Sequence, residues 1–295
     1  MPELPEVVVY VEALEARILG AVLDGVRVRS ISLLRTYDPP LAAVAGATVS
    51  GVSRLGKRIV VECGDLALVI HLMVAGRLRW KERGAAIPGK IGLAAFDFST
   101  GTLLLTEAGT KRRASLHLVR GAAGIRALDP GGIDVAAAGA DDFAAALGKE
   151  RHTLKRSLTD ARLFNGIGGA FADEILHRAR LSPLQMSDRL DAGERARLHD
   201  AARAVLAEWT ERRRAEAGGA FPEKVSAFHP DMAVHGKYGT PCPVCGTAVQ
   251  RIVYSSRETN YCPRCQTGGK VLADRALSRL LKEDWPGTIE ELEGN

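Results

Sequence analysis

The sequence predicts a multidomain α+β protein: an antiparallel β-sandwich capped by an N-terminal helix, then a helical domain, then a small module with four cysteines. Three observations support this prediction. Short runs of alternating or β-branched residues fill the region between residues 22 and 118. Apolar residues then recur at helical spacing between residues 154 and 209. Two C-x-x-C pairs follow between residues 242 and 265.

The first helix is expected just after the N-terminus. Pro5 suits the first turn of a helix, where a missing backbone N–H costs little. Apolar residues then recur at helical spacing until Gly20 ends the pattern. These positions are Val7, Val11, Leu14 and Ile18. They predict one helix with a buried face that covers the sandwich.

Six short runs predict the strands of the sandwich. They cover residues 25–32, 48–54, 58–62, 66–72, 93–98 and 102–106. Glycine-containing turns at 63–65 and 99–101 separate two pairs of these runs, which indicates hairpins and antiparallel pairing.

The rest of the chain divides by composition. An Ala/Gly/Pro-rich stretch at 121–139 is expected to cross between domains, and helical periodicity follows until a glycine pair at 218–219. We therefore expect a catalytic β-sandwich domain at 1–120, a helical DNA-binding domain at 135–219, a zinc finger at 238–266 and a C-terminal extension at 267–295.

Charge favours a polyanionic partner without requiring one. The net charge is +5, from 40 Lys and Arg against 35 Asp and Glu, and the last thirteen residues contain five acids and no base. The rest of the chain is therefore +10, that is, 40 minus 30. A basic body suits nucleic acid, although ordinary solubility explains such a charge equally well. No secretory signal or membrane span is recognisable, so we expect a soluble, cytoplasmic protein.

The cysteines predict one structural zinc ion. Cys242 and Cys245 form one C-x-x-C pair, and after sixteen intervening residues Cys262 and Cys265 form the second. This spacing is typical of a four-thiolate zinc site, which has no open coordination position for catalysis. The fifth cysteine, Cys63, is expected to take no part.

The segment between the cysteine pairs predicts a hairpin that presents a cation. Residues 249–254 are expected to form a strand and residues 259–261 its return. The tip would then lie at Ser255, Ser256 and Arg257. Arg257, and not the zinc ion, is therefore the functional candidate of this module.

The N-terminus is a second candidate site. Removal of Met1 would expose the secondary amine of Pro2, and the positive end of the following helix should lower its pKa. Such an amine can attack an aldehyde-like sugar carbon and form an iminium ion, which allows elimination of the flanking phosphates. Glu3, one residue away, could transfer the protons.

Four motifs together resemble the formamidopyrimidine-DNA glycosylase and endonuclease VIII family. They are M-P-E-L-P-E-V at the start, the lysine of R-L-G-K-R, the segment G-I-G-G-A-F-A-D-E-I-L and the finger C-P-V-C…C-P-R-C-Q. The resemblance runs from Met1 to Gln266. It implies a β-sandwich domain, a helix-two-turn-helix domain and a zinc hairpin, with damaged double-stranded or abasic-site DNA bound as a monomer.

The resemblance also implies roles for individual residues. Pro2 would form a Schiff base at the sugar C1′ carbon, and Glu3 would donate a proton. Lys57 would act as second base or phosphate contact, although most lysines at turns are simply exposed. Arg257 would hold the phosphate at the lesion and assist the second elimination.

The glycines before a predicted helix form a candidate phosphate site. Gly168 and Gly169 would present free backbone N–H groups at the positive end of that helix. A flexible start of the helix is the alternative reading. Family members carry Asn where this chain has Gly169, and Lys155 matches a basic position that faces the DNA backbone.

Two departures concern the residues that fill the gap left by an extruded base. The family segment H-L-G-M-S-G is here H-L-M-V-A-G, so Val74 stands where the inserted Met is expected and Met73 replaces a glycine. A buried strand position is the alternative for Met73. The family's R-R-F-G motif becomes Arg112-Arg113-Ala114-Ser115, without the aromatic residue.

We therefore expect a bifunctional glycosylase and abasic-site lyase of base excision repair, acting on oxidised or ring-opened purines. The stretch between Gly219 and the finger is shorter than in the purine-specific enzymes, which favours an endonuclease VIII-like preference for oxidised pyrimidines. A DNA damage-binding protein without catalysis is the third possibility. Intact Pro2, Glu3 and Lys57 argue against it.

Overall fold

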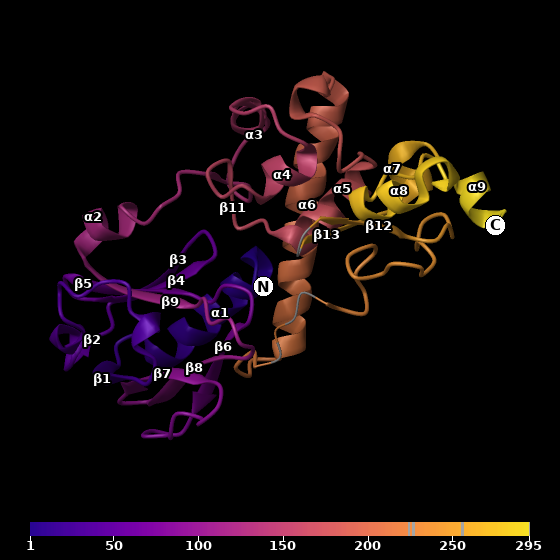
Figure 1. Ribbon diagram of the computed structural model, residues 1–295. Helices are drawn as coiled ribbons and strands as arrows, with labels where there is room; N and C mark the ends of the chain where they lie inside the picture. The colour runs from indigo at the N-terminus through magenta and orange to yellow at the C-terminus, as the bar shows by residue number, and fades with distance from the viewer. Residues whose placement is uncertain (224, 226–227, 255–256, 295) are drawn as a thin grey trace. The chain divides into compact units, whose positions relative to one another are not determined.

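The structure is a computed structural model that describes residues 1–223, 225, 228–254 and 257–294. It consists of two compact units, which are described separately (Figure 1). Unit 1 combines Met1–Pro130 with Trp209–Ala227, and unit 2 combines Gly131–Glu208 with Phe228–Asn295. Among the described residues, no helix has the length and apolar character needed to cross a membrane.

Unit 1 is an antiparallel β-sandwich, as predicted. One sheet has the order β2-β1-β7-β8-β6 and the other the order β3-β4-β5-β9, with every pair antiparallel. The first sheet consists of β1 (Val22–Val28), β2 (Ala47–Thr48), β6 (Gly76–Lys81), β7 (Gly92–Phe98) and β8 (Gly101–Glu107). The second consists of β3 (Gly51–Leu55), β4 (Arg58–Cys63), β5 (Leu66–His71) and β9 (Ser115–Arg120).

Two expected strands have other limits in the structure. The run expected at 25–32 becomes β1 followed by the short 3-10 helix η1 (Ile31–Leu33). The run expected at 48–54 is divided between β2 and β3, because the chain changes sheets there. The Val49 N–H donates to Ala21 O, beside the first sheet, whereas the next N–H, of Ser50, donates to Glu62 O in the second.

The helix α1 (Leu4–Ile18) packs against β3 and β4 and completes the core of the sandwich (Figure 1). Its buried residues Val7, Tyr10, Leu14 and Ile18 belong to one apolar cluster with residues of both sheets. The outer face of the second sheet is partly covered by α2 (Gly121–Arg126), which packs against β5 and β9. A second 3-10 helix, η2 (Leu41–Val44), packs beside β1.

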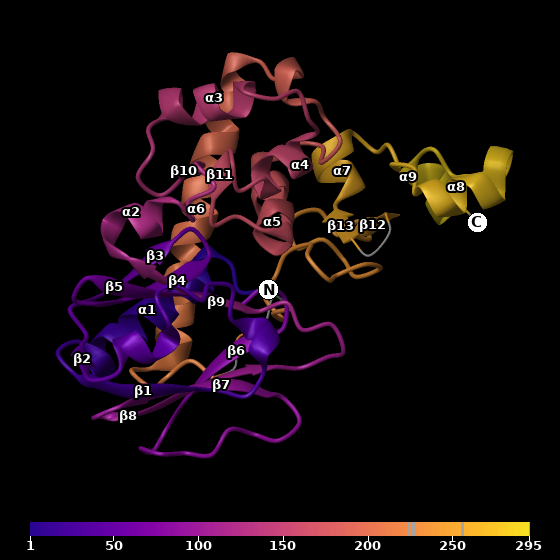
Figure 2. The same cartoon turned by 60° about the vertical axis from the view of Figure 1, so that its left-hand side comes forward.

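Unit 2 is helical, as predicted, and also contains the cysteine module and the C-terminal extension (Figure 2). Its helices are α3 (Ala140–Gly148), α4 (Leu154–Thr159), α5 (Gly169–Ala179), η3 (Ser187–Arg189) and the long α6 (Ala192–Ala217), whose last residues belong to unit 1. A short parallel pair joins β10 (Ile133–Asp134) to β11 (Phe164–Asn165).

The cysteine module contains the predicted hairpin. It consists of β12 (Gln250–Tyr254) and β13 (Arg257–Tyr261), followed by α7 (Pro263–Thr267). Two expected tip residues, Ser255 and Ser256, lie outside the described residues. The C-terminal extension contributes α8 (Arg275–Leu281), η4 (Lys282–Asp284) and α9 (Ile289–Glu293).

Candidate active site and zinc centre

The amino terminus lies at the buried start of α1. Pro2 is buried and Glu3 is 2% exposed, and the helix begins with the next residue. The Glu3 N–H donates to Glu6 Oε2 at 2.9 Å, and these two residues form a capping box. Such a box fixes how the first residues enter the helix. Met1, which precedes Pro2 here, is half-buried.

The surroundings of the amino terminus favour its neutral form. Burial is the largest influence on the pKa of the amine at Met1 and lowers it. Glu3 and Glu6 raise this pKa, whereas Arg77 and Lys57 lower it, and the net result is a lowered pKa. A larger share of the amine is therefore neutral near pH 7 than at an exposed terminus, and the neutral amine is the nucleophile.

Lys57 lies at the turn between β3 and β4, next to Gly56, whose φ is +59°. Its side chain is half-buried, so it is not the exposed lysine that its residue type alone suggests. Burial lowers the pKa of Lys57, and the negative charge of Glu3 opposes this shift. Glu3 therefore influences both the amine and Lys57, and these three groups belong to one site within unit 1.

Glu6 is a member of this site that sequence reasoning missed. Burial raises the pKa of Glu6 to about 7, although the charge of Arg213 acts in the opposite direction. The Arg213 Nε donates to Glu6 Oε1 at 3.2 Å, and both side chains are buried. The available signal was the second acid of P-E-L-P-E, three residues after Glu3, which is the spacing of a capping box.

A cavity of about 430 Å³ adjoins Glu6 within unit 1. Besides Glu6 and Arg213, its lining includes Glu216, Phe221 and Glu223. The volume falls in the range of small-molecule sites, about 300–1,000 Å³. The wall thus combines three carboxylates and one arginine with apolar side chains.

The expected wedge residues form the turn between β5 and β6. Met73 is half-buried with a φ of +52°, and Val74 is 56% exposed. The reading of Met73 as a core strand residue is therefore wrong, because β5 ends at His71. Arg77 stabilises the turn by donating to Val74 O at 3.2 Å and to Gly76 O at 2.7 Å. Val74 is the side chain that this turn exposes.

The segment before β9 is held by a buried carboxylate. Glu107 accepts the N–H of Arg113 at 3.0 Å and the N–H of Ala114 at 3.1 Å. Ala114 is 3% exposed and belongs to the sandwich core. Arg113 is exposed, as is Arg112, which donates to Lys90 O at 2.8 Å. The two arginines are thus the surface residues of this segment, and position 114 presents no side chain to solvent.

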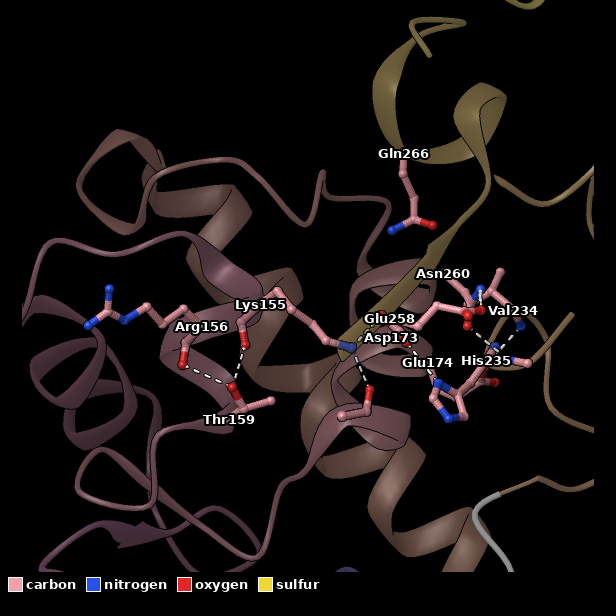
Figure 3. Close-up of polar contacts among 12 residues, drawn as sticks. Lys155, Arg156, Thr159, Asp173, Glu174, Val234, His235, Glu258, Asn260 and Gln266 are labelled. Atoms are coloured by element: carbon pink, nitrogen blue, oxygen red, sulfur yellow. Dashed lines mark hydrogen bonds and ion pairs between the residues drawn. The ribbon is translucent and has the colours of Figure 1, made fainter. Parts of the chain in front are cut away.

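In unit 2, Lys155 is bound at the first turn of α5 (Figure 3). Its Nζ lies 2.5 Å from both Asp173 Oδ1 and Gly169 O. His235 Nδ1 lies 2.8 Å from the other oxygen of Asp173. Gly168 caps the helix and Gly169 is its first residue. A Cβ at Gly169 would meet no heavy atom within 4 Å, so packing does not exclude the family's Asn here.

The neighbouring Glu174 fixes a second segment of the chain (Figure 3). Its carboxylate accepts the N–H groups of Ala233, Val234 and His235 at 2.8, 2.9 and 2.9 Å. Burial raises the pKa of Glu174, and the three donors oppose that shift. Sequence reasoning missed this role, although two adjacent acids inside the apolar helix segment A-F-A-D-E-I-L were the available signal.

The four predicted cysteines come together in unit 2. The sulfurs of Cys242, Cys245, Cys262 and Cys265 all lie within 4.8 Å of one another. The Cys242–Cys265 and Cys245–Cys262 sulfur distances are 3.9 and 3.4 Å. A tetrahedral zinc site with Zn–S bonds of about 2.3 Å needs edges of roughly 3.8 Å. The cluster fits a zinc ion.

Three further residues show what belongs to this cluster and what does not. His177 Nε2, on α5, lies 3.3 Å from Cys242 Sγ. Cys63 is buried in the sandwich core of unit 1 and has no part in the cluster. Arg257 is exposed and opens β13, opposite Tyr254.

Comparison with known families accounts for most of the chain. The model of the formamidopyrimidine-DNA glycosylase N-terminal domain matches residues 1–114 and that of its H2TH domain matches residues 129–217. A formamidopyrimidine-DNA glycosylase of Heliobacterium modesticaldum is 33% identical over 282 residues, covering 90% of this chain and 100% of the relative. The chain belongs to the formamidopyrimidine-DNA glycosylase family.

Other relatives extend this result. A glycosylase of Rhizorhabdus wittichii is 34% identical over 281 residues and is likewise covered in full. An uncharacterized formamidopyrimidine-DNA glycosylase-like protein of Mycobacterium tuberculosis is 42% identical over 159 residues, which are 53% of this chain and 96% of that protein. Among solved structures, the Lactococcus lactis glycosylase in complex with abasic-site DNA matches with a TM-score of 0.79 at 24% identity, covering 90% of this chain and 99% of that one.

The third family model identifies the cysteine cluster. A zinc finger found in these glycosylases and in isoleucyl-tRNA synthetase matches residues 239–268, which include all four cysteines. This glycosylase therefore carries one structural zinc site, as the cysteine spacing predicted. A closed set of four thiolates leaves no coordination position for substrate, so the role of the metal is to hold the hairpin.

Proposed function

We propose that this DNA glycosylase excises oxidised or ring-opened purines from double-stranded DNA and then cleaves the abasic site, using the amine of Pro2. The observation that carries the proposal is the half-buried amino terminus, whose pKa is lowered and whose electrostatic environment includes Glu3 and Lys57. After removal of Met1, the secondary amine of Pro2 would be the terminal amine of the chain. A protein that only binds damage has no use for such an amine.

The proposed reaction begins at the sugar. The Pro2 nitrogen attacks C1′ as the bond from C1′ to the base breaks, and the proton that this nitrogen loses neutralises the departing base. Glu3 then donates a proton to the ring oxygen O4′ as the C1′–O4′ bond breaks, and the nitrogen lone pair forms the iminium ion. The resulting iminium ion accepts the electron pair left at C2′ when a proton is removed. The 3′ C–O bond then breaks, and a second elimination breaks the 5′ C–O bond. Lys57 is proposed as second base, and water finally releases Pro2.

The remaining site residues are proposed to bind DNA. Arg257 would hold the phosphate at the lesion and assist the second elimination, and the N–H groups at Gly168 and Gly169 would bind another phosphate. Lys155 would act by fixing the first turn of α5, since its ammonium already binds Gly169 O and Asp173. Complexes of the related Lactococcus lactis protein with abasic-site DNA support DNA as the partner of this protein.

A preference for oxidised pyrimidines is the second candidate. Only nineteen residues separate Gly219 from the matched finger at 239, and the cavity beside Glu6 draws part of its lining from this segment. A short segment closes less completely over a large base. The Lactococcus lactis protein has been solved both with ring-opened purine and with oxidised pyrimidine DNA, so both substrate classes are to be tested.

The test is borohydride trapping on an oligonucleotide with an abasic site. The protein that begins at Pro2 is expected to give a covalent complex whose linkage maps to Pro2, because borohydride reduces the iminium ion to a stable amine. A variant with one residue retained ahead of Pro2 is the matched control and is expected to give none. Equal trapping of the two proteins would rule out Pro2 as the nucleophile, and a panel of purine and pyrimidine lesions would rank the substrates.

A further inference from the structure

The end of the chain lies beyond the part that the family models match. The zinc-finger model ends at residue 268, and the C-terminal extension continues through α8, η4 and α9. This segment closes on itself, because the Val271 N–H donates to Gly287 O and the Ile289 N–H to Gly269 O, both at 2.9 Å. Val271 and Ile289 are 5% and 2% exposed. The extension is therefore a folded element in which two apolar side chains are buried.

Asp274 joins this element to the hairpin. It is 3% exposed, and its Oδ2 accepts the N–H of Val253, in β12, at 2.7 Å. Its Oδ1 accepts the N–H of Leu277, in the first turn of α8, at 3.1 Å. A second contact lies nearby, where the Leu272 N–H donates to the hydroxyl of Tyr261 at 2.7 Å. One carboxylate thus caps α8 and holds the edge of β12, beside which α8 packs (Figure 2).

The hairpin depends on such contacts for a fixed conformation. An isolated two-stranded hairpin is marginally stable in water. The zinc ligand Cys262 follows β13 and fixes the base of the hairpin. The outer side of β13 is supported by α5 and by Asn260, which accepts the N–H of Gly236 at 2.8 Å. The Val253–Asp274 bond supplies the corresponding support to β12.

The position of this bond matters for Arg257. Val253 lies opposite Glu258, and the next pair along the hairpin is Tyr254 opposite Arg257. Asp274 therefore holds the strand one residue away from the pair that contains Arg257. An exposed arginine loses conformational entropy when it binds a phosphate, and a strand that is already fixed reduces this loss.

We infer that the C-terminal extension positions Arg257 for the reaction and that Asp274 is the positioning residue. The inference rests on the proposed function, in which Arg257 binds the phosphate at the lesion. It assigns a role to a segment that the family models do not match. Asp274 acts through the backbone of β12 and is not itself a catalytic residue.

The test is a double-mutant cycle in the full-length zinc-loaded protein. We expect Asp274→Ala to slow the second elimination on a preformed abasic site about tenfold, a coupling of ordinary size for residues that act together. In an Arg257→Ala background, the same substitution is expected to change the rate less than about twofold. Equal losses in both backgrounds, or no loss in the parent, would overturn the inference.

Three controls separate positioning from other effects. Asp284→Ala removes an exposed acid of the same extension and is expected to leave the rate unchanged. Asp274→Ser keeps a side-chain oxygen that can cap α8. This single oxygen cannot accept from both the Val253 and the Leu277 N–H groups, so the second elimination should be slow in this variant too. Hydrogen exchange at the Val253 amide should accelerate in Asp274→Ala, with one zinc retained per chain. If the Val253 amide exchanged at the same rate in Asp274→Ala as in the parent, the inference would be contradicted. This measurement needs no DNA.

The two proposals fail in different ways. If the parent protein is not trapped at Pro2, the proposed function fails. If the parent is trapped while Asp274→Ala and Arg257→Ala slow the reaction independently, the proposed function stands and the positioning role fails.

Discussion

At the scale of single residues, buried acidic side chains fix the polar segments of unit 1. Glu6 and Glu3 cap α1 and surround the amino terminus, and Glu107 orders the segment that carries Arg112 and Arg113. A buried carboxylate is costly unless donors satisfy it, which is the reason each of these accepts backbone N–H groups. Glu6 has the largest consequence, because its pKa is raised into the physiological range.

We predict that Glu6→Gln makes the free energy of unfolding less sensitive to pH. Burial raises the pKa of Glu6 to about 7 in the folded state, whereas an unfolded Glu titrates near 4.3. The folded protein therefore favours the protonated acid, and the stability from this group is present below about pH 4.3 and lost as the pH rises through about 7.

Gln resembles the protonated acid at every pH. The variant and the parent should be similar near pH 4, and by pH 8 the variant should gain about 4 kcal/mol relative to the parent, from a pKa that rises from about 4.3 to about 7 at about 1.4 kcal/mol per pKa unit. Urea unfolding at several pH values measures this difference. A difference that is constant with pH would show that Glu6 has an ordinary pKa. Glu12→Gln, at an exposed ion pair on the same helix, is the matched control.

A second residue prediction concerns Met73. Its φ of +52° is a conformation in which a side chain costs about 1–2 kcal/mol and glycine costs nothing. Met73→Gly and Met73→Ala both remove the side chain, so they differ mainly in this backbone strain. We expect the Gly variant to be more stable than the Ala variant by about 1 kcal/mol in thermal unfolding. Equal stabilities, or a more stable Ala variant, would show that the turn adopts another conformation in solution.

At the scale of elements, α5 organises unit 2. Asp173 binds Lys155 and His235, Glu174 binds the segment 233–235, and one turn later His177 reaches the sulfur of Cys242. Three polar side chains of one helix thus hold the candidate phosphate site, the segment before the finger and the zinc cluster. Such contacts around a metal orient its ligands and contribute to its affinity.

We predict that His177→Ala weakens zinc binding about 10- to 100-fold, because the Cys242 sulfur loses a partner that orients it. Competition with a chromogenic chelator measures the affinity. His229→Ala, at a half-buried histidine of the same unit, should leave it unchanged. Equal affinity in the parent and in His177→Ala would mean that this contact has no influence on the metal.

The sequence predicted some of these helices and strands and missed others. Helical spacing predicted α1 and α6, and the C-x-x-C pairs predicted the finger, because these patterns are local. The strands β6 and β9 were missed. Arg77, Arg79 and Lys81 in β6, and His117 and Arg120 in β9, made both segments resemble loops, although apolar residues alternate with them as in a half-buried strand.

The candidate site was predicted only in part, for a physical reason. Pro2, Glu3 and the cysteines belong to short motifs that can be recognised in one stretch of chain. The pairing of Glu6 with Arg213 joins residues 207 positions apart, and the binding of Glu174 to Val234 joins residues 60 positions apart. Contacts between residues so far apart in the sequence form only in the complete fold, and no local sequence pattern predicts them.

At the scale of the whole molecule, the altered wedge predicts how the protein treats duplex DNA. Extruding a base costs a few kcal/mol, which inserted side chains must offset. Val74 is shorter than Met, and Ala114 is buried in the core. We therefore expect little discrimination among the bases opposite a lesion, and faster reaction when the target is mismatched or unpaired.

Excision of 8-oxoguanine opposite cytosine, adenine or a gap measures this discrimination. Val74→Met is expected to restore part of the preference for paired substrates, and Met73→Ala should have little effect because Met73 is half-buried at the turn. A strong cytosine preference in the parent that Met73→Ala abolishes would show that Met73 is the inserted residue instead.

Unit 1 is assembled from two separate stretches, and this arrangement imposes an order on biosynthesis. The amino terminus leaves the ribosome first, but Arg213, the partner of Glu6, is made 207 residues later. At roughly 5–20 residues per second, the delay is about 10–40 s. During that interval the nascent sandwich has Glu6 without its cation and the cavity without most of its wall. The site is therefore completed only when translation has passed Val225, so a ribosome that stalls earlier would leave an incomplete site.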